Sequence, residues 1–215
     1  ISKKIIMSNN EYISNLTFKR KFLLTTLGIV FFAISFYIFL SSISFNFDDT
    51  GWLVISNIES KNIFGISGSY ISGFLFKEFG LLTPYCLVLI FLVYSFKYLK
   101  HKFISKLWFK LILMLGLIFL SGLLSQPFHS FLSVYFFEES KILTYQGFSF
   151  RTYETILDNL NKLLKLSNGN IIIVLNLSLT ILFILNFIYV ASTSFKELLY
   201  IKIIFKPLYL PIIWT

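Results

Sequence analysis

Long apolar runs separated by polar stretches dominate the pattern of this chain. Uncharged or nearly uncharged runs cover about residues 22–43, 81–96, 107–125 and 171–195. The first run would be about 33 Å long as a helix, enough to cross a hydrocarbon core of about 30 Å. Fourteen of its residues are Leu, Ile, Val or Phe, so insertion gains on the order of 6 kcal/mol. The pattern predicts an all-α polytopic membrane protein with four transmembrane helices.

The first run is predicted to stay in the mature chain. A cleaved signal peptide would have a shorter apolar region followed by small residues at the cleavage site. Here the run is followed by Phe45-Asn46-Phe47. Residues 1–21 before it are polar and basic, and they form a separate N-terminal segment.

Short amphipathic helices are predicted between the spans, in the membrane interface. After Pro127, which marks the exit of the third span, apolar residues recur at helical spacing: Phe128, Phe131, Leu132, Tyr135 and Phe136. A second stripe at Tyr153, Ile156, Leu157, Leu160, Leu163 and Leu164 lies opposite polar residues. Asn168-Gly169 is predicted to end that helix. The tail, residues 196–215, contains prolines and is predicted to lie along the membrane surface.

The basic residues indicate the orientation of the spans. Thirteen of the 19 Lys and Arg lie in the N-terminal segment, in residues 97–110 and in the tail, with only two acids. The other two loops hold six basic residues and eight acids. Positive residues gather at the cytoplasmic ends of spans, so both termini are predicted to be cytoplasmic. Lys110 is near enough to its span end to extend to the headgroups.

Composition supports the membrane class. The chain is 56% hydrophobic and 13% charged, against about 25% charged in a soluble chain. A single cysteine, Cys86, excludes a disulfide framework within one chain. The net charge of +9 is explained by topology and anionic lipid, so no direct nucleic-acid binding is expected.

The sequence gives little support for an enzyme. Gly65-Ile66-Ser67-Gly68 spells the G-x-S-G of rhomboid-type proteases, but a serine nucleophile needs a histidine within about 3 Å. Ser67 is predicted in an exposed loop, His101 on the other side of the membrane, and His129 at a span exit. The glycines are therefore interpreted as a turn before a helix. Neither H-E-x-x-H nor G-x-x-x-x-G-K-[ST] occurs, so we predict no catalytic residue, cofactor or metal site.

Two asparagines lie inside the fourth span. Asn176 and Asn186 are about 80° apart on a helical wheel, and Thr180 is one turn from Asn176. A transport site would have charged groups facing a cavity, and no acid lies in any predicted span. Interhelical hydrogen bonds, at about 0.6 kcal/mol each, are one predicted role, and drift in an AT-rich coding sequence, with no role for these asparagines, is the equal alternative.

The stretch between the first two spans resembles the N-terminal four-span membrane domain of the FtsK/SpoIIIE DNA translocases. The resemblance rests on Asp49-x2-Trp52, then Asn62-x2-Gly65-x2-Gly68-x2-Ile71, then Phe79-Gly80-x3-Pro84. It implies a bacterial inner-membrane anchor at the division septum, in contact with other division proteins, with a homo-oligomer as an option. Family members continue into a hexameric ATPase motor, which these residues do not include, so the chain is interpreted as a fragment or a split-gene product.

The resemblance also implies a short amphipathic helix over Gly68–Phe79, lying parallel to the membrane. Its apolar face is predicted to hold Ile71, Phe74, Leu75 and Phe79, with Ser72 off that face and Lys77 in water. The residues singled out as the loop motif are Asp49, Trp52, Asn62, Gly65, Gly68, Phe79, Gly80 and Pro84. The alternative function, unrelated to division, is a small four-span transporter or channel subunit.

Overall fold

The described part of the chain folds entirely into helices, turns and loops. The structure is a computed structural model that describes residues 18–55, 59–135, 147–164 and 168–191. Within these ranges there are six α-helices: α2 (Phe18–Ile43), α3 (Gly65–Phe79), α4 (Leu82–Leu99), α5 (Leu107–Tyr135), α6 (Phe148–Leu164) and α7 (Asn168–Val190). The all-α fold class is therefore confirmed. The predicted surface tail, residues 196–215, lies outside the described residues.

Four of these helices are long and apolar enough to cross a membrane. The spans are Phe18–Ile43, Leu82–Leu99, Leu107–Pro127 and Gly169–Val190, which confirms the prediction of four transmembrane helices. α2 begins before the predicted apolar run. Its first turns include the basic residues Lys19, Arg20 and Lys21. α3 and α6 are the shorter helices that connect spans.

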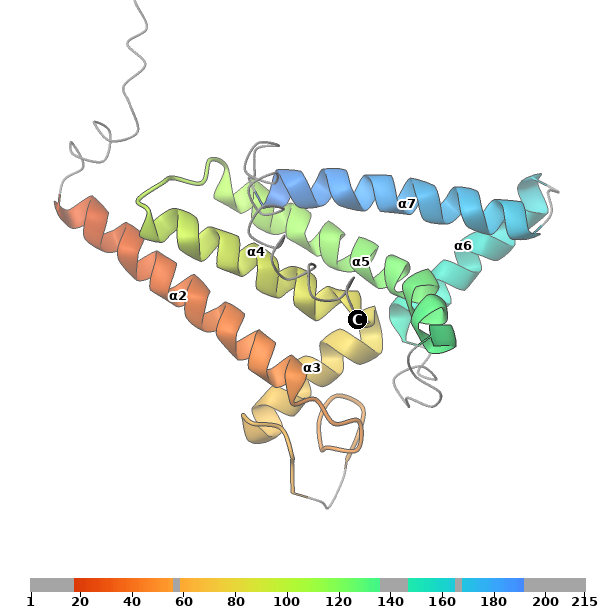
Figure 1. The fold of residues 1–215 in the computed structure, drawn as a ribbon, viewed down its shortest axis with the longest axis horizontal. Helices are drawn as coiled ribbons and strands as arrows, with labels where there is room; N and C mark the ends of the chain where they lie inside the picture. Colours follow the sequence, from red (N-terminus) through yellow and green to blue (C-terminus); the bar gives the residue numbers. More distant parts are fainter. Residues whose placement is uncertain (1–17, 56–58, 136–146, 165–167, 192–215) are drawn as a thin grey trace, which may run out of the picture.

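The four spans form a row in the order α2, α4, α5, α7 (Figure 1). α2 packs mainly on α4, α4 also on α5, and α5 also on α7. Neighbouring spans are antiparallel. The last residues of α2 and the first residues of α4 and α7 therefore lie on the same side of the domain. We call this the α3 end, because α3 and α6 both lie there, crossing the direction of the spans (Figure 1). α2 and α7 are the two edges of the row.

Small residues let α2 approach α4 closely. A Cβ placed on Gly28 would lie 2.9 Å from Leu99 Cγ, so no larger residue fits without a shift. Ser35 is fully buried and its hydroxyl donates to the Val88 carbonyl over 2.9 Å. Small side chains at helix contacts are the usual means of packing helices in lipid, where the hydrophobic effect does not drive association.

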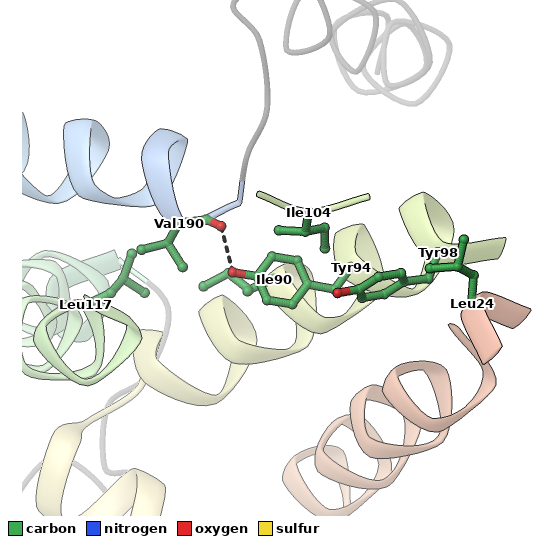
Figure 2. Close-up of a cluster of buried hydrophobic side chains, with 7 residues drawn as sticks. All are labelled: Leu24, Ile90, Tyr94, Tyr98, Ile104, Leu117 and Val190. Carbon is green, nitrogen blue, oxygen red and sulfur yellow. Dashed lines mark hydrogen bonds between the residues drawn. The ribbon is translucent and has the colours of Figure 1, made fainter. Parts of the chain in front are cut away.

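A buried cluster connects α2 and α7, the two edge helices, on the side of the domain opposite α3. Its members are Leu24, Ile90, Tyr94, Tyr98, Ile104, Leu117 and Val190 (Figure 2). The Tyr94 hydroxyl donates to the Val190 carbonyl over 2.7 Å. That carbonyl is in the last turn of α7, where carbonyls lack a partner within the helix. Tyr94 thus closes the end of α7 from a helix that is two places away in the row.

Two predicted helix boundaries are wrong. α5 continues through Pro127 to Tyr135, so residues 128–135 extend the third span helix instead of forming a separate one; Phe136 lies outside the described residues. Figure 1 shows the last part of α5 turning away from its first part, as expected where a proline interrupts the hydrogen-bond ladder. Asn168-Gly169 begins α7 and does not end α6, whose last residue is Leu164. A Gly at a helix end favours positive φ, and Gly169 does not have it.

Candidate functional site

Asp49 is a buried carboxylate around which the loop between α2 and α3 folds. It is 4% exposed. Oδ1 accepts from the Lys61 amide at 3.0 Å, and Oδ2 accepts from the Asn62 amide at 3.0 Å. The hydroxyls of Ser60 and Ser69 lie 3.1 and 3.2 Å from Oδ2. Burial raises the pKa of Asp49, but these hydrogen bonds outweigh burial and leave the pKa below its ordinary value of 3.8.

Asn62 ties the same loop to α2 and to the start of α3. Its Nδ2 donates to the Ser41 carbonyl over 2.8 Å, and its Oδ1 accepts from the Phe64 amide at 3.1 Å. Gly68 lies directly beside it: a Cβ there would overlap Asn62 Oδ1 and come 2.9 Å from Phe64 Cβ. Gly65, the first residue of α3, has φ +60°, a conformation that glycine adopts without strain. Asn62, Gly65 and Gly68 therefore form one compact turn.

A tight turn projects from this loop. The amide and carbonyl groups of Gly51 and Val54 hydrogen-bond to each other at 3.0 and 3.2 Å. Leu53, inside the turn, has φ +61°, which is unfavourable for a residue with a side chain. Leu53 and Ile55 are 62% and 95% exposed. The strained turn thus displays two aliphatic side chains at the α3 end.

α3 turns a face rich in small residues to the protein and leaves most of its predicted apolar face exposed. Gly68, Ser69, Ser72, Gly73, Leu75, Phe76 and Lys77 are buried. Ile66, Tyr70, Ile71 and Phe74 are exposed. Of the predicted apolar face, only Leu75 is buried. Ile71 and Phe74 are thus free to rest on the membrane surface, and that contact stays a prediction.

Lys77 is not in water, and the prediction that placed it there is wrong. Only 5% of it is exposed, and its Nζ donates to the Trp52 carbonyl over 3.2 Å. The same ammonium lies 4.6 Å from the centre of the Phe47 ring, a cation–π contact. Burial lowers the pKa of Lys77, while the nearby charge of Asp48 raises it. The long Lys77 side chain extends from α3 to Trp52 and Phe47 in the loop. A helical wheel shows only where a residue lies around the helix axis, so it does not predict this burial.

Glu78 joins α3 to α6. One carboxylate oxygen accepts from Trp52 Nε1 at 2.9 Å, and the other accepts from the Phe148 amide, the first in α6, at 3.0 Å. Its main-chain carbonyl accepts from the Ser149 hydroxyl at 2.9 Å. A carboxylate at a helix N-terminus satisfies an unpaired amide and complements the helix dipole. A Cβ on Gly147 would overlap the Lys77 carbonyl, so glycine permits this close junction.

The Phe79-Gly80 corner turns the chain from α3 into α4. Gly80 has φ +82°, and a Cβ there would lie 2.6 Å from Ser125 Cβ of α5. The Ser125 hydroxyl accepts from the Leu82 amide at 3.1 Å. Pro84 is buried in the first turn of α4, where a missing amide hydrogen costs little. Gly80 thus combines a backbone conformation and a close contact that each favour glycine.

The eight predicted motif residues therefore fall into two groups, one at each end of α3. Asp49, Asn62, Gly65 and Gly68 surround the start of α3, and Phe79, Gly80 and Pro84 form the corner after it. Trp52 links the groups through Glu78. The sequence interpretation missed Glu78, Ser69 and Ser125. Glu78 could have been found as the one acid in a short apolar helix, whereas the two serines carry no distinguishing pattern.

The other candidate groups behave as packing residues. Ser67 donates to the Phe64 carbonyl and accepts from the Tyr37 hydroxyl, each at 3.0 Å. His101 lies after α4, at the opposite end of the row from Ser67 (Figure 1). Asn176 does form an interhelical hydrogen bond, since its Oδ1 accepts from the Tyr153 hydroxyl of α6 at 2.8 Å. Among the described residues, no three His, Cys, Asp or Glu side chains gather closely enough to hold a metal ion.

The fold and this loop define a membrane domain of the multi-pass class, with four spans and a structured connection at the α3 end. A family model for the 4TM region of DNA translocase FtsK/SpoIIIE matches residues 20–195, and the chain belongs to this family. The match confirms the resemblance that the loop motif indicated, and it makes the chain a multi-pass inner-membrane anchor domain. The matched region is the membrane region of the translocase and not its motor. Neither a curated protein nor a solved structure matches the chain.

Proposed function

We propose that this domain anchors its protein at the division septum, with both termini in the cytoplasm and the α3 end facing outward. The observation that carries the proposal is the family match over residues 20–195. The charge distribution supports the orientation, because 13 of the 19 basic residues lie in the segments assigned to the cytoplasm. No P-loop sequence occurs in these residues, so we expect no ATP hydrolysis by them.

The surface that contacts other division proteins is, in this proposal, the one displayed by the strained turn. Leu53 and Ile55 are exposed there, and the hydrogen bonds of Asp49 hold the adjoining loop in a fixed conformation. Exposed aliphatic groups on an ordered loop provide the apolar centre that protein interfaces use. Holding a strained turn costs on the order of 1–3 kcal/mol, which favours a role for the side chain it presents.

The packing of the polar span residues argues against the transporter or channel alternative. Ser35 donates to the Val88 carbonyl, and the hydroxyls of Thr83 and Ser121 are 2.8 Å apart and both fully buried. These groups are used for contacts between helices. A transport pathway would instead present polar groups to a water-filled cavity.

The proposal is tested with a fluorescent protein fused to the C-terminus. The wild-type fusion should gather at midcell. The double variant Leu53→Gly/Ile55→Ser removes the exposed side chains, and Gly at 53 relieves the positive φ, so the turn is kept while midcell enrichment falls several-fold. Phe103→Ser is the matched control, because Phe103 is 54% exposed at the opposite end of the row.

Two outcomes would contradict the proposal. If the intact wild-type fusion spreads evenly around the envelope while dividing cells form normal septa, septal anchoring is wrong and the transporter alternative is favoured. If the wild-type fusion localises and the double variant localises equally well, the turn is not the contact surface.

A further inference from the structure

The end of the row opposite α3 is strongly positive. Of the described residues, eight Lys and Arg lie there, three in the first turns of α2 and five in residues 97–110. All six described acids lie elsewhere, in the loop between α2 and α3, in α3 and in α6. The terminal segments that adjoin this end, residues 1–17 and 192–215, add five basic residues and only two acids. Neither the described residues nor these segments hold enough acids to neutralise this end, so its charge is complementary to an anionic partner.

A short loop of fixed conformation carries three of these charges. Residues 100–106 connect α4 to α5. The His101 amide donates to the Tyr98 carbonyl over 2.9 Å. The Lys102 amide donates to the Lys97 carbonyl, also over 2.9 Å. This pair of bonds is the Schellman arrangement that closes a helix end, and His101 has the positive φ, +53°, that it requires. The loop displays three exposed lysines: Lys100, Lys102 and Lys106.

A fourth charge comes from α2. The start of α2 and the connection between α4 and α5 lie at the same end of the row (Figure 1), and Leu24 and Ile104 belong to one buried cluster. Lys21 is three residues before Leu24 and therefore on the same face of α2, where it is half-buried. It thus adjoins the loop that contains Ile104. We call the four lysines the basic patch: Lys21, Lys100, Lys102 and Lys106.

Two exposed aromatic side chains indicate the depth of the basic patch in the membrane. Trp108 is 81% exposed, and it lies in the first turn of α5, where the apolar span begins. Phe22, the neighbour of Lys21, is 67% exposed. Trp is enriched at the membrane–water interface, with its ring at the level of the headgroups. The basic patch therefore lies in the headgroup layer, directly beside side chains that can contact acyl chains.

We propose that the basic patch binds the phosphate groups of anionic phospholipids, with Trp108 and Phe22 against their acyl chains. Lysine ammonium groups bind phosphate as point charges, and basic pockets at the cytoplasmic ends of spans suit anionic headgroups. A soluble phosphate or a nucleic acid would use the lysines but leave both aromatic side chains without a partner. Because residues 100–106 directly join two spans, the loop also holds its lysines close to the membrane surface.

This site is more specific than a general attraction between a basic surface and anionic lipid. Three of its charges belong to a loop fixed by the Schellman bonds, and the fourth belongs to a helix face packed against the same cluster. Removing charge within the basic patch should therefore matter more than removing the same charge elsewhere. The proposal does not rest on the septal role proposed above.

The test is native mass spectrometry of the full chain, released from micelles with equal amounts of anionic phosphatidylglycerol and zwitterionic phosphatidylcholine. The wild type should retain at least fivefold more phosphatidylglycerol than phosphatidylcholine. Lys102→Gln/Lys106→Gln should reduce this ratio at least threefold. Lys61→Gln/Lys162→Gln is the matched control, because it removes the same net charge outside the basic patch and should leave the ratio unchanged. All four side chains are exposed, so the substitutions leave the packing of the domain intact.

Further measurements distinguish lipid from other anions. Trp108→Ser should lower the retention of phosphatidylglycerol at least twofold, because the acyl chains lose a contact. Excess inorganic phosphate and a double-stranded DNA oligonucleotide should each leave phosphatidylglycerol bound, since neither replaces that contact.

Five results would overturn the proposal. The wild type could show no preference for phosphatidylglycerol, or Trp108→Ser could retain it fully. Equal losses in the two double variants would show that net charge alone attracts the lipid. Displacement by inorganic phosphate would identify a soluble phosphate as the ligand of the basic patch, and displacement by the oligonucleotide would identify a nucleic acid. None of these results depends on where in the cell the domain lies.

Discussion

At the scale of single residues, Asp49 is the acceptor that holds the loop between α2 and α3. Its carboxylate accepts from two main-chain amides and lies beside two serine hydroxyls. Hydrogen bonds to an ionised group contribute about 1.5–3 kcal/mol each. The charge of Asp49 therefore stabilises a segment that would otherwise be a long unstructured connection.

We expect Asp49→Asn to lower the free energy of unfolding by about 2 kcal/mol at neutral pH. The folded pKa of Asp49 is below 3.8, so its contribution is present above the unfolded pKa and is lost as pH falls through the folded value. The difference between variant and wild type should therefore shrink below about pH 4. Thermal unfolding in detergent at several pH values measures this. Asp48→Asn, at an exposed neighbour, should cost at most about 1 kcal/mol, and an equal loss there would refute the role of Asp49.

Gly68 should be among the least replaceable residues of the loop. In Gly68→Ala the new Cβ would overlap Asn62 Oδ1, so either Asn62 or α3 must move, at a cost of about 1–3 kcal/mol. Gly169→Ala is the matched control, because its Cβ position has no contact within 4 Å from elsewhere in the described residues and Ala favours a helix by up to about 1 kcal/mol. Melting temperatures of the two variants should move in opposite directions. If Gly68→Ala melts like the wild type, the close contact is not as the structure shows it.

Asp49 and Gly68 were predicted from the resemblance to the family's loop motif, Asp49-x2-Trp52 and Gly65-x2-Gly68, since position alone does not distinguish Asp49 from the adjacent Asp48. The resemblance did not indicate Ser69 or Ser125. Serines are common in this chain, and only a folded structure shows which of them lie opposite Asp49 or Gly80. Buried polar contacts of this kind depend on residues far apart in the chain, for which periodicity carries no information.

At the scale of elements, Glu78 makes α3 and α6 a single unit across one end of the row. We expect Glu78→Ala to free the first turn of α6, because the Phe148 amide loses a charged acceptor. Hydrogen exchange at the first amides of α6 should accelerate about tenfold, corresponding to about 1.4 kcal/mol. Glu154→Ala, on the exposed side of α6, should leave exchange unchanged. Faster exchange throughout α7 as well would indicate general unfolding instead of a local release.

The orientation of α3 shows what an amphipathic pattern can and cannot predict. The pattern of apolar residues predicted a helix in the correct place, but not which face meets the protein. In water the apolar face must turn inward, whereas in a bilayer the surroundings are as apolar as the core. Ser72 and Gly73 are then the better packing face, because their small side chains admit the loop around Trp52.

At the scale of the whole molecule, the number of spans was predictable and their arrangement was not. Span number follows from length and hydropathy alone, but the row order depends on which helix contains small residues opposite another, such as Gly28 opposite Leu99. The orientation across the membrane is a separate question. It rests on the charge count and remains a prediction.

Cysteine labelling tests that orientation. In a Cys86-free variant, single cysteines at Lys61 and Asn159 should react with an impermeant thiol reagent on intact spheroplasts, and one at Ser105 should not, because basic residues keep the loop after α4 in the cytoplasm. All three side chains are exposed, so access to the reagent depends on the side of the membrane. Labelling at Ser105 alone would show that the predicted orientation is reversed.

The hydrogen bond from Tyr94 to the Val190 carbonyl also has a mechanical consequence (Figure 2). Tension applied to the chain beyond Val190 would reach α4 directly through this bond, and α2 through the packing of Tyr98 and Leu24 in the same cluster. The load would therefore be shared by helices on both sides of the row, instead of peeling α7 away from its edge. A domain built in this way resists being pulled apart one helix at a time.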